Sequence, residues 1–416
     1  MLVLVSDIHL MDRPGWSTVH GKRLVQRLSE LAEQNQNRSL DRFTIGFLGD
    51  IFDLLHSQAW FEVEPQVRPW DIEVTEKHRE TVRKIYQAIR SANLDFFNLL
   101  ADLKRNYPAT RIHYLPGNHD RALNTSMGDL VRDQVCRDLA LEATGSIFQD
   151  TLVFPEYSTM ARHGHEWDGR NVYALGQAAV GDFIVIDILE QLPRSIAAKL
   201  DWSIDDQRLA YFREVAYVVP QDLRNILGWI FAGLSRLEHT VPGMREVAES
   251  ALVEIFDVTE KFMAENRERF LLPQYLSWLI YLANSQFLRN RRMTMLEWAR
   301  VLRFSISGDP FLSRQLLGAQ SDFAAAFFGK FTTLATGHTH EALLESKKGD
   351  PERRFANTGA WGRAHEVRVG TRTFDMSAFD TYDYDSLVMV FSEREQRLSN
   401  IDSSRLERGK VLARRP

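Results

Sequence analysis

Five short polar clusters occur along this chain, and each one directly follows a short apolar run. In chain order they are Asp7-Ile8-His9, Gly49-Asp50-Ile51-Phe52-Asp53, Gly117-Asn118-His119-Asp120, His163-Gly164-His165 and Gly337-His338-Thr339-His340. Short apolar runs that end in Gly, Asn or Asp are typical of buried strands followed by turns. In open α/β sheets, loops from several strands meet outside the carboxyl ends of the strands. The pattern therefore predicts an α/β fold in which five loops surround one site.

The segments around these clusters alternate between strand and helix patterns. The apolar runs before the clusters predict strands over residues 2–5, 43–48, 112–115, 159–161 and 333–336. Apolar residues at helical spacing predict helices over residues 21–34 and 76–103. Further strand patterns occur at residues 354–357, 365–369 and 387–391. This alternation indicates strand-helix-strand units.

A large all-helical insertion interrupts the alternation. From residue 168 to residue 330 the chain has helical periodicity, is rich in Leu, Ile, Phe and Trp, and is divided by prolines. Because the polar clusters lie on both sides of the insertion, we predict a discontinuous main domain over residues 1–167 and 331–395. The highly charged residues 396–416 are predicted to form a solvated C-terminal tail.

Composition narrows the classes of protein that fit the chain. The 51 Lys and Arg nearly balance the 56 Asp and Glu, so the net charge of -5 argues against general attraction to nucleic acid or anionic membranes. The single cysteine, Cys136, excludes an intramolecular disulfide and suits a reducing compartment. No signal-peptide pattern precedes the first strand, and the apolar segment 174–192 carries too many acidic residues to span a membrane. We therefore expect a cytoplasmic protein, and its oligomeric state stays open.

The first two clusters offer carboxylate ligands for cations. Asp7 and His9 can converge on a cation in the turn after a strand, although an Asp-x-His pair alone is a weak signal. Asp50 can bridge two cations while Asp53 stays outside their ligand shells. Taken alone, Asp50 and Asp53 are better explained as part of a helix N-terminus, where exposed N–H groups and the helix dipole favour Asp.

The third cluster is more specific. Asn118 supplies a neutral amide oxygen as a ligand, and the adjacent His119 can stabilise a phosphoryl group or protonate its leaving oxygen. A carboxylate partner would fix the tautomer of this imidazole, and Asp53 is the candidate. The alternative is that Asn118 and His119 form a simple turn capped by Asp120.

The last two clusters are rich in histidine. Imidazole suits Mn²⁺, Fe and Zn²⁺, and carboxylates extend the range to harder ions. His163, His338 and His340 are therefore candidate ligands, whereas His165 and Arg162 are candidates for substrate contacts. Six of the twelve histidines fall in the five clusters, and the other six are expected to be surface or core residues.

Together the five clusters resemble the motifs of the calcineurin-like metallophosphoesterase superfamily, which run D-x-H, G-D-x-x-D, G-N-H-[DE], H and G-H-x-H. The resemblance covers these loops and, by strand order, about residues 1–167 and 331–391, which would form the catalytic domain. It implies a metallophosphoesterase β-sandwich flanked by helices on both outer faces, an αββα arrangement. The helical insertion lies outside the resemblance.

The resemblance also implies a role for each residue of the clusters. One ion would be held by Asp7, His9, Asp50 and His340. The other ion would be held by Asp50, Asn118, His163 and His338, so that Asp50 bridges the two. His119 would be the catalytic histidine, and Asp53 would orient it.

The implied activity is hydrolysis of a phosphomonoester, phosphodiester or pyrophosphate bond in a small-molecule substrate. Two divalent ions, Mn²⁺ with Fe or Zn²⁺ as alternatives, would supply a bridging hydroxide that attacks phosphorus in line. A catalytically silent binding scaffold of the same fold is a different class of function. A nuclease is disfavoured by the absence of a long basic stripe, and a protein phosphatase by Leu54 and Leu55 in place of an Arg-rich extension.

Two motifs suggest a narrower substrate class. Gly49-Asp50-Ile51-Phe52-Asp53 and Asn357-Thr358-Gly359-Ala360-Trp361 are similar to motifs of the UDP-diacylglucosamine pyrophosphatases of lipid A synthesis. Those enzymes typically have Arg at the place of His119, and their helical insertion is much shorter. Because of these two differences, a UDP-sugar or lipid-precursor pyrophosphatase at a membrane surface is kept only as an alternative.

The chain enters the insertion just after His163 and returns to the main domain just before His338. Because both ends of the insertion lie next to candidate ligands, we predict that it forms a cap subdomain that selects the substrate. Its recurring aromatic residues are Trp229, Phe231, Trp278, Tyr281, Phe287 and Trp298, and its arginines include Arg289, Arg291, Arg292, Arg300 and Arg303. A basic amphipathic helix of this kind can make peripheral contact with a membrane or bind an anionic ligand. The alternative is the core and solvated face of an ordinary helical subdomain.

Overall fold

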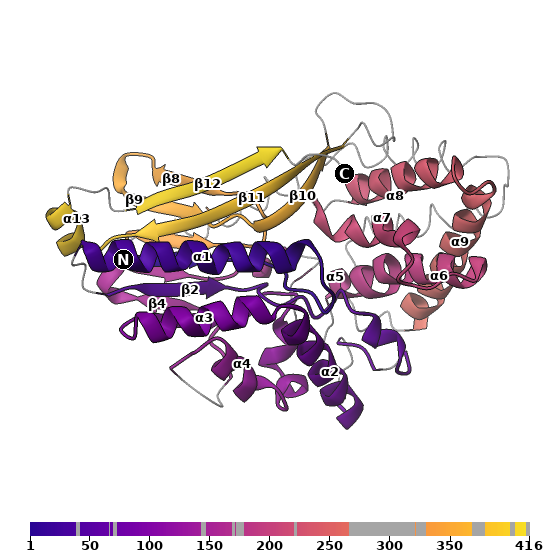
Figure 1. Cartoon of the computed structure of the whole chain (residues 1–416), viewed down its shortest axis with the longest axis horizontal. Helices are drawn as coiled ribbons and strands as arrows, with labels where there is room; N and C mark the ends of the chain where they lie inside the picture. Colours follow the sequence, from indigo (N-terminus) through magenta and orange to yellow (C-terminus); the bar gives the residue numbers. More distant parts are fainter. Residues whose placement is uncertain are drawn as a thin grey trace. The chain divides into compact units, whose positions relative to one another are not determined.

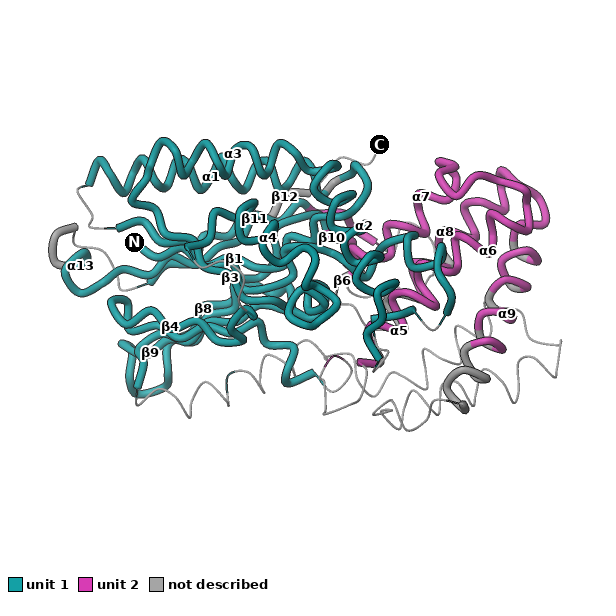
Figure 2. The backbone as a smooth tube through the Cα atoms, turned by 90° about the horizontal axis from the view of Figure 1, so that it is seen from below, with its two compact units in different colours: residues 1–168, 313–363, 383–413 teal, residues 169–312, 364–382, 414–416 magenta. Residues whose placement is uncertain are grey.

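A computed structural model gives the fold of residues 1–38, 42–65, 67–69, 73–142, 147–168, 171, 179–219, 223–265, 321, 330–367, 379–399 and 404–412. The chain forms two compact units, shown in different colours in Figure 2. The first comprises residues 1–168, 313–363 and 383–413, and the second comprises residues 169–312, 364–382 and 414–416. The first unit is thus discontinuous. Residues 364–382, which the sequence analysis assigns to the main domain, group with the second unit.

A seven-stranded mixed sheet carries the first three clusters. Its order is β3-β2-β1-β11-β10-β6, with β12 paired to β11. The strands are β1 (Leu2–Val5), β2 (Thr44–Leu48), β3 (Arg111–Leu115), β6 (Val218–Val219), β10 (Trp361–Val367), β11 (Phe379–Val390) and β12 (Ser404–Leu412). Strands β1, β2 and β3 are parallel, and β11 is antiparallel to β1. The carboxyl ends of β1, β2 and β3 therefore meet at one edge of the sheet.

A five-stranded sheet in the order β4-β5-β7-β9-β8 carries the other two clusters. Its strands are β4 (Leu152–Phe154), β5 (Thr159–Ala161), β7 (Thr333–Thr336), β8 (Leu343–Lys347) and β9 (Asp350–Asn357). Strand β7 is parallel to both β5 and β9. One buried apolar core contains Leu4 and Val388 of the first sheet together with Phe154, Ala161 and Ala335 of the second. The chain is therefore a mixed α/β protein in which two mixed sheets pack face to face.

Helices cover the outer face of the seven-stranded sheet. Helices α1 (Trp16–Asn37) and α3 (Leu94–Asn106) lie side by side over it (Figures 1 and 2). The helix layer predicted over the outer face of the second sheet stays a prediction. Helix α4 (Arg132–Asp138) buries Cys136. Short 3-10 helices join the larger elements: η1 (Gln58–Phe61), η2 (Arg121–Asn124), η3 (Ser126–Gly128), η4 (Pro155–Tyr157) and η5 (His165–Trp167).

The single helix predicted over residues 76–103 is wrong in its continuity. The chain forms α2 (Glu76–Ala92) and then α3, and the break falls at Asn93. The buried amide of Asn93 donates hydrogen bonds to the carbonyl oxygens of Met11 at 2.9 Å and Ile89 at 2.7 Å. Because this side chain competes for backbone partners, it ends α2 and ties the junction to the loop after β1.

The solvated tail predicted for residues 396–416 is also wrong for its described part. Helix α13 (Glu393–Ser399) begins before it, and residues 404–412 form β12, which pairs with β11. The Arg354 guanidinium donates to the carbonyl oxygen of Ser404 at 2.7 Å, and Arg27 donates to both carboxylate oxygens of Glu407 at 2.7 and 2.8 Å. Glu407, one of the charges that suggested solvation, is thus paired with Arg27 within the fold.

The second unit is mainly helical, as the sequence predicts. It contains α5 (Val180–Phe183), the π-helix η6 (Ile184–Glu190), α6 (Gln191–Leu200), η7 (Gln207–Leu209), α7 (Ala210–Arg213), η8 (Glu214–Tyr217), α8 (Leu223–Glu238) and α9 (Met244–Glu265). It also contains β6 and parts of β10 and β11, and the residues of β6 pair with His365 and Glu366 of β10. The rings of Tyr211, Trp229 and His365 stack in sequence, with centroids 4.2 and 4.0 Å apart. Trp229 is buried, so this aromatic residue of the insertion belongs to a core.

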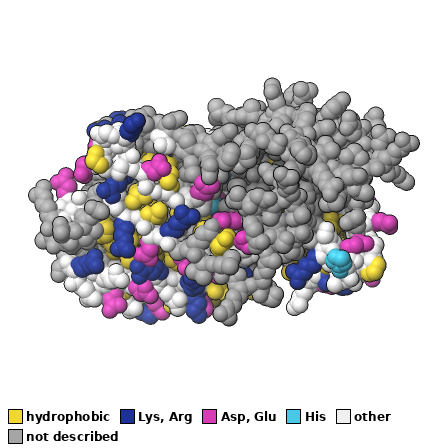
Figure 3. Space-filling view, turned by 90° about the horizontal axis from the view of Figure 1, so that it is seen from above, with side chains coloured by type: hydrophobic (Ala, Val, Ile, Leu, Met, Phe, Trp, Pro, Cys, Tyr) yellow, Lys and Arg dark blue, Asp and Glu magenta, His cyan; other side chains and the backbone are white. Residues whose placement is uncertain are grey.

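The other aromatic and basic residues of the predicted membrane-contacting or ligand-binding helix lie outside the described residues, as does the side chain of Phe231. Among the helices that the structure describes, none combines the length and the apolar character needed to cross a bilayer. On the face seen in Figure 3, the described Lys and Arg side chains are interspersed with Asp and Glu. This mixture agrees with the near balance of charges in the sequence.

Candidate metal centre

All five polar clusters begin just after the end of a strand, as the sequence predicts: β1, β2, β3, β5 and β7. Hydrogen bonds between the loops hold them together. The backbone N–H of Asp7 donates to the carbonyl oxygen of Gly49 at 3.1 Å, and that of His9 donates to Asp50 at 3.0 Å. The N–H of Gly337 donates to the carbonyl oxygen of His163 at 2.7 Å. Clusters that are far apart in sequence therefore form one site.

Glycine is required where two loops approach most closely. A Cβ atom at Gly117 would lie 2.7 Å from His163 Nε2 and closer still to Asp50 Oδ1. Side-chain carbon atoms do not approach neighbours this closely. Gly117 therefore leaves the space in which the Asp50 carboxylate and the His163 ring meet.

Five predicted ligands have an unusual backbone conformation. Asp7, His9, Asp50, His338 and His340 have φ angles of 55°, 51°, 53°, 71° and 60°. Left-handed φ values are uncommon for residues other than glycine, and such strain concentrates at functional sites. The hydrogen bonds between the loops hold the residues in this conformation.

The first group of ligand atoms comes from Asp7, His9 and His340. His340 Nε2 lies 3.3 Å from both Asp7 Oδ1 and His9 Nε2. His9 Nε2 also lies 4.0 Å from Asp7 Oδ1 and from Asp50 Oδ2. Together with Asp50, these are the residues that the resemblance assigns to one ion.

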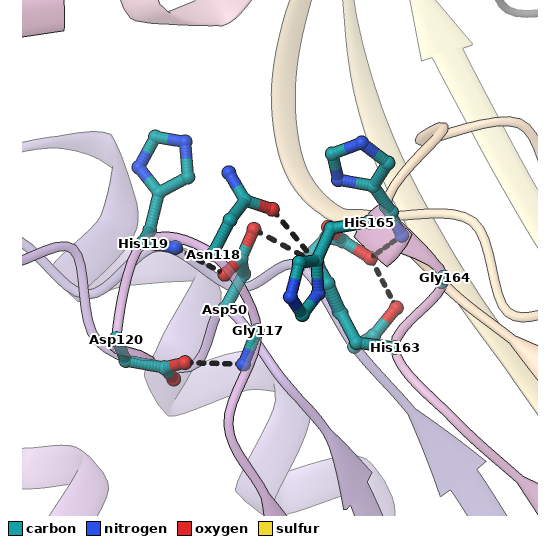
Figure 4. Close-up of polar contacts among 12 residues, drawn as sticks. Asp50, Gly117, Asn118, His119, Asp120, His163, Gly164 and His165 are labelled. Carbon is teal, nitrogen blue, oxygen red and sulfur yellow. Dashed lines mark hydrogen bonds and ion pairs between the residues drawn. The ribbon is translucent and has the colours of Figure 1, made fainter. Parts of the chain in front are cut away.

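The second group comes from Asp50, His163 and His338. His163 Nε2 lies 3.2 Å from Asp50 Oδ2 and 3.2 Å from Asn118 Oδ1, as Figure 4 shows. Asp50 Oδ2 thus faces His163 of this group and His9 of the first group. This is the position that a carboxylate bridging two ions would take.

Partners at the other ring nitrogen fix two of these imidazoles. His163 Nδ1 donates to the carbonyl oxygen of Leu48 at 2.7 Å, which leaves the lone pair on Nε2. His9 Nδ1 lies 3.1 Å from Asp53 Oδ2, which leaves its Nε2 lone pair toward His340. Hydrogen bonding of this kind orients histidines that bind metals.

Asp53 contacts His119 as well as His9. His119 Nδ1 lies 3.0 Å from Asp53 Oδ1, and the backbone N–H of His119 donates to Asp50 Oδ1 at 2.8 Å. The structure therefore brings together the two residues predicted to be catalytic. Sequence reasoning missed His56, whose N–H donates to Asp53 Oδ1 at 3.1 Å and whose ring stacks on that of His119 with centroids 5.8 Å apart.

The two candidate substrate-contact residues differ in position. The ring of His165 lies beside the second group, with its centroid 5.4 Å from that of His163 and 6.3 Å from that of His338. Burial and these two imidazoles hold the pKa of His165 well below its ordinary value, so this ring is neutral. The guanidinium of Arg162 forms an ion pair with Glu166, Nε to Oε1 2.8 Å. A substrate contact of Arg162 stays a prediction.

The electrostatics of the site are dominated by buried carboxylates and imidazoles. Burial alone would raise the pKa of Asp7, but the His340 and His163 imidazoles lower it to about 2. Burial likewise opposes ionisation of Asp50, and His163 and His119 outweigh it, so its pKa lies well below the usual value. Burial would lower the pKa of His163, whereas the Asp50 carboxylate raises it to about 10. Without a metal ion, a proton on His163 therefore balances part of the negative charge.

Two residues support the ligand loops: Asp120, which was considered from the sequence only as a turn cap, and Asn357. Asp120 Oδ1 accepts from the N–H of Gly117 at 2.5 Å, and its Oδ2 accepts from that of Ile51 at 2.9 Å, so this carboxylate joins the second and third loops. The buried amide of Asn357 donates to the carbonyl oxygen of Gly337 at 2.8 Å. Asn357 therefore supports the fifth loop. Its signal is the Asn357-Thr358-Gly359 motif, which the sequence analysis notes only as a resemblance.

The carboxylate, amide and imidazole atoms gathered at this site are suitable ligands for divalent cations. Asp7 Oδ1 is buried without a hydrogen bond, although it lies in the middle of the first group. The nearest imidazole nitrogens to it are His340 Nε2 at 3.3 Å and His9 Nε2 at 4.0 Å. Carboxylate, amide and imidazole acceptors gathered in this way repel one another unless a cation lies between them. The residues present therefore suit two ions that share Asp50.

Comparison with models of known protein families gives no match to this chain, and comparison with curated proteins gives none either. The interpretation of the site therefore rests on the positions of its residues and on the spacing of its motifs.

Proposed function

We propose that this protein is a metal-dependent phosphoesterase that hydrolyses a phosphomonoester, phosphodiester or pyrophosphate bond in a small molecule. The observation that carries the proposal is a pair of adjacent ligand groups, with Asp50 in one group and 4.0 Å from His9 of the other, next to the hydrogen-bonded pair His119 and Asp53. Other metal proteins share single elements of this site. The combination of two adjacent cation sites and an oriented imidazole suits attack on phosphorus.

Under this proposal, Asp7, His9, Asp50 and His340 would hold one ion, and Asp50, Asn118, His163 and His338 would hold the other. Divalent ions bound there, with Mn²⁺ as the first candidate, would activate a water and would neutralise the charge of the phosphoryl oxygens. His119 keeps Nδ1 on Asp53, so its Nε2 is the atom that carries a proton to the leaving oxygen. Asp53 fixes the direction of that proton.

An assay with chromogenic esters tests the proposal. Purified full-length protein is incubated with Mn²⁺ and either p-nitrophenyl phosphate or bis-p-nitrophenyl phosphate. We expect release of p-nitrophenol that stops when EDTA is added and returns with excess Mn²⁺. The ratio of the two rates separates monoesterase from diesterase activity, and a pyrophosphate substrate measured by phosphate release covers the third class. Inactivity toward all three, with two ions bound, would instead support the silent scaffold.

The alternative of a UDP-sugar or lipid-precursor pyrophosphatase gains no support from its second motif. In this structure Asn357 donates to Thr336 Oγ1 at 3.1 Å and to the Gly337 carbonyl oxygen. Thr358 Oγ1 lies 2.6 Å from Ser6 Oγ, in the loop that leads to Asp7. The motif therefore supports ligand loops, a role that any substrate class would need. We expect substrate selection to come from the helical insertion.

Metal binding should release a proton, because His163 is protonated in the metal-free protein. The pKa of His163 is raised from its ordinary value of 6.5 to about 10. The ring therefore carries a proton at neutral pH, and an ion that binds to it must displace this proton. We expect about one proton released per protein at pH 7.5, and an apparent affinity that rises about tenfold per pH unit. Calorimetry in two buffers with different ionisation enthalpies measures the proton count. The exposed His239→Gln control should leave it unchanged, whereas equal heats in both buffers would contradict the prediction.

A further inference from the structure

A buried carboxylate outside the five motifs contacts one of the candidate ligands. Asp168 Oδ2 lies 3.3 Å from His338 Nε2, and the two side chains are 5% and 8% exposed. Both residues belong to the first compact unit. Asp168 is placed there by η5, since its backbone N–H donates to the carbonyl oxygen of His165 at 3.0 Å. A carboxylate that follows the fourth loop thus contacts a histidine of the fifth loop.

The position of Asp168 determines which nitrogen of His338 can bind an ion. An imidazole whose Nε2–H donates to a carboxylate has its lone pair on Nδ1, on the other side of the ring. Asp168 is not a member of the ligand group that Asp50, His163 and His338 form. The carboxylate of Asp168 therefore contacts the ring of His338 but does not belong to the group of atoms that would bind the ion.

Two other candidate ligands have the same kind of support. His163 uses Nδ1 for the Leu48 carbonyl oxygen, and His9 uses Nδ1 for the Asp53 carboxylate. In each case one ring nitrogen is held by an acceptor and the other faces the ligand group. A carboxylate partner also makes the imidazole a stronger ligand, and removing such a partner typically lowers metal affinity 10- to 100-fold.

We propose that Asp168 is a positioning residue for the second ion: it holds His338 as the Nε2–H tautomer, so that Nδ1 of His338 binds the ion shared with Asp50, His163 and Asn118. This inference rests on the proposed function for the presence of two ions. It adds a residue that none of the five motifs contains. It also assigns opposite ring nitrogens to His163, which binds through Nε2, and His338, which binds through Nδ1.

Titration of the full-length protein with Mn²⁺ tests the inference. Binding is followed by calorimetry and by electron paramagnetic resonance, which distinguishes an exchange-coupled pair of ions from a single ion. In Asp168→Ala we expect one of two Mn²⁺ affinities to fall about 10- to 100-fold while the other is unchanged. The coupled signal should then require more Mn²⁺. Asp102→Ala, at an exposed position on α3, is the matched control and should bind like the wild type.

Asp168→Asn is the second variant, because it keeps the volume of the side chain and can still accept from Nε2–H. Asp168→Asn should weaken binding of the same ion, because the negative charge is lost. The effect should be smaller than that of Asp168→Ala, because the hydrogen bond to His338 is kept. Unchanged affinity for both ions in Asp168→Asn, or an equal loss for both in Asp168→Ala, would overturn the inference. Binding of fewer than two ions by the wild type would overturn it as well.

The proposed function and this inference fail in different ways. A wild-type protein that binds two Mn²⁺ but hydrolyses none of the test esters refutes the phosphoesterase. In that case a selective loss of one ion in Asp168→Ala would still support the role of Asp168.

Discussion

Replacing Asp50 with alanine is expected to abolish phosphoester hydrolysis and to release bound metal. Asp50 Oδ2 lies 3.2 Å from His163 Nε2 of its own ligand group and 4.0 Å from His9 Nε2 of the other, so the carboxylate faces both groups. Its Oδ1 accepts the N–H of His119, which positions the catalytic candidate. The same carboxylate therefore faces both ligand groups and also contacts the third loop. The substitution therefore removes more of the site than any other single change.

The expected fall in kcat/KM is at least about 1000-fold, because charge stabilisation by two ions contributes several kcal/mol to the transition state. Metal content is measured by mass spectrometry after gel filtration, and hydrolysis is measured with excess Mn²⁺. The control is Asp95→Ala, because Asp95 lies on the surface of α3, where its carboxylate is 58% exposed. It should retain both ions and full activity.

One result would contradict this prediction, and a second measurement keeps it testable. Near-normal hydrolysis by Asp50→Ala would refute the assignment of the site. Loss of activity together with loss of the folded state would leave the cause unassigned, so the melting temperature is measured on the same sample. Asp50→Asn, which keeps the shape of the side chain, should be as inactive as Asp50→Ala, because a neutral amide does not balance the charge of two cations.

The positions of the loops could be predicted from the sequence because each loop has a local signal. An apolar run followed by Gly, Asn or Asp marks the end of a strand, and β1, β2 and β3 are found where this signal occurs. Parallel pairing then brings the carboxyl ends of these strands to one edge. The same reasoning places the fourth and fifth clusters after β5 and β7.

Features that depend on tertiary contacts had no such signal. The left-handed backbone conformation of Asp50 is stabilised by hydrogen bonds with another loop. The presence of Asp or His in a sequence does not by itself predict this conformation. Strand β12 was obscured by charges whose partners, such as Arg27, are hundreds of residues away. Asp168 contacts a histidine 170 residues further along the chain. Spacing within a motif carries no information about any of these contacts.

The end of α2 shows a further limit. Helical periodicity continues through residue 93, and Asn is only mildly unfavourable inside a helix. The break arises because the Asn93 amide is buried and finds acceptors at Met11 and Ile89. The position of Met11 is known only once the loop after β1 is placed. Local propensity therefore predicted a helix, and a distant carbonyl group decided where it ends.

Replacing His119 with alanine is expected to lower turnover about 100- to 10,000-fold with both ions retained, which is the usual contribution of a general acid. His119 belongs to neither of the two groups assigned to the ions, and its Nδ1 is held by Asp53. The measurements are kcat at saturating Mn²⁺ and the Mn²⁺ content. His239→Ala, at an exposed position of the second unit, serves as the control and should behave like the wild type.

The partner substitution Asp53→Asn should have two separable effects, since its two oxygens contact different histidines. Oδ1 contacts His119 Nδ1 at 3.0 Å and Oδ2 contacts His9 Nδ1 at 3.1 Å, so an amide must present an N–H to one of them. In the wild-type background we expect both lower kcat and weaker Mn²⁺ binding. In the His119→Ala background, Asp53→Asn should still weaken Mn²⁺ binding but cause little further loss of kcat at saturating Mn²⁺, because the residue it orients is gone. Multiplicative losses of kcat in the double variant would show that Asp53 does not act through His119.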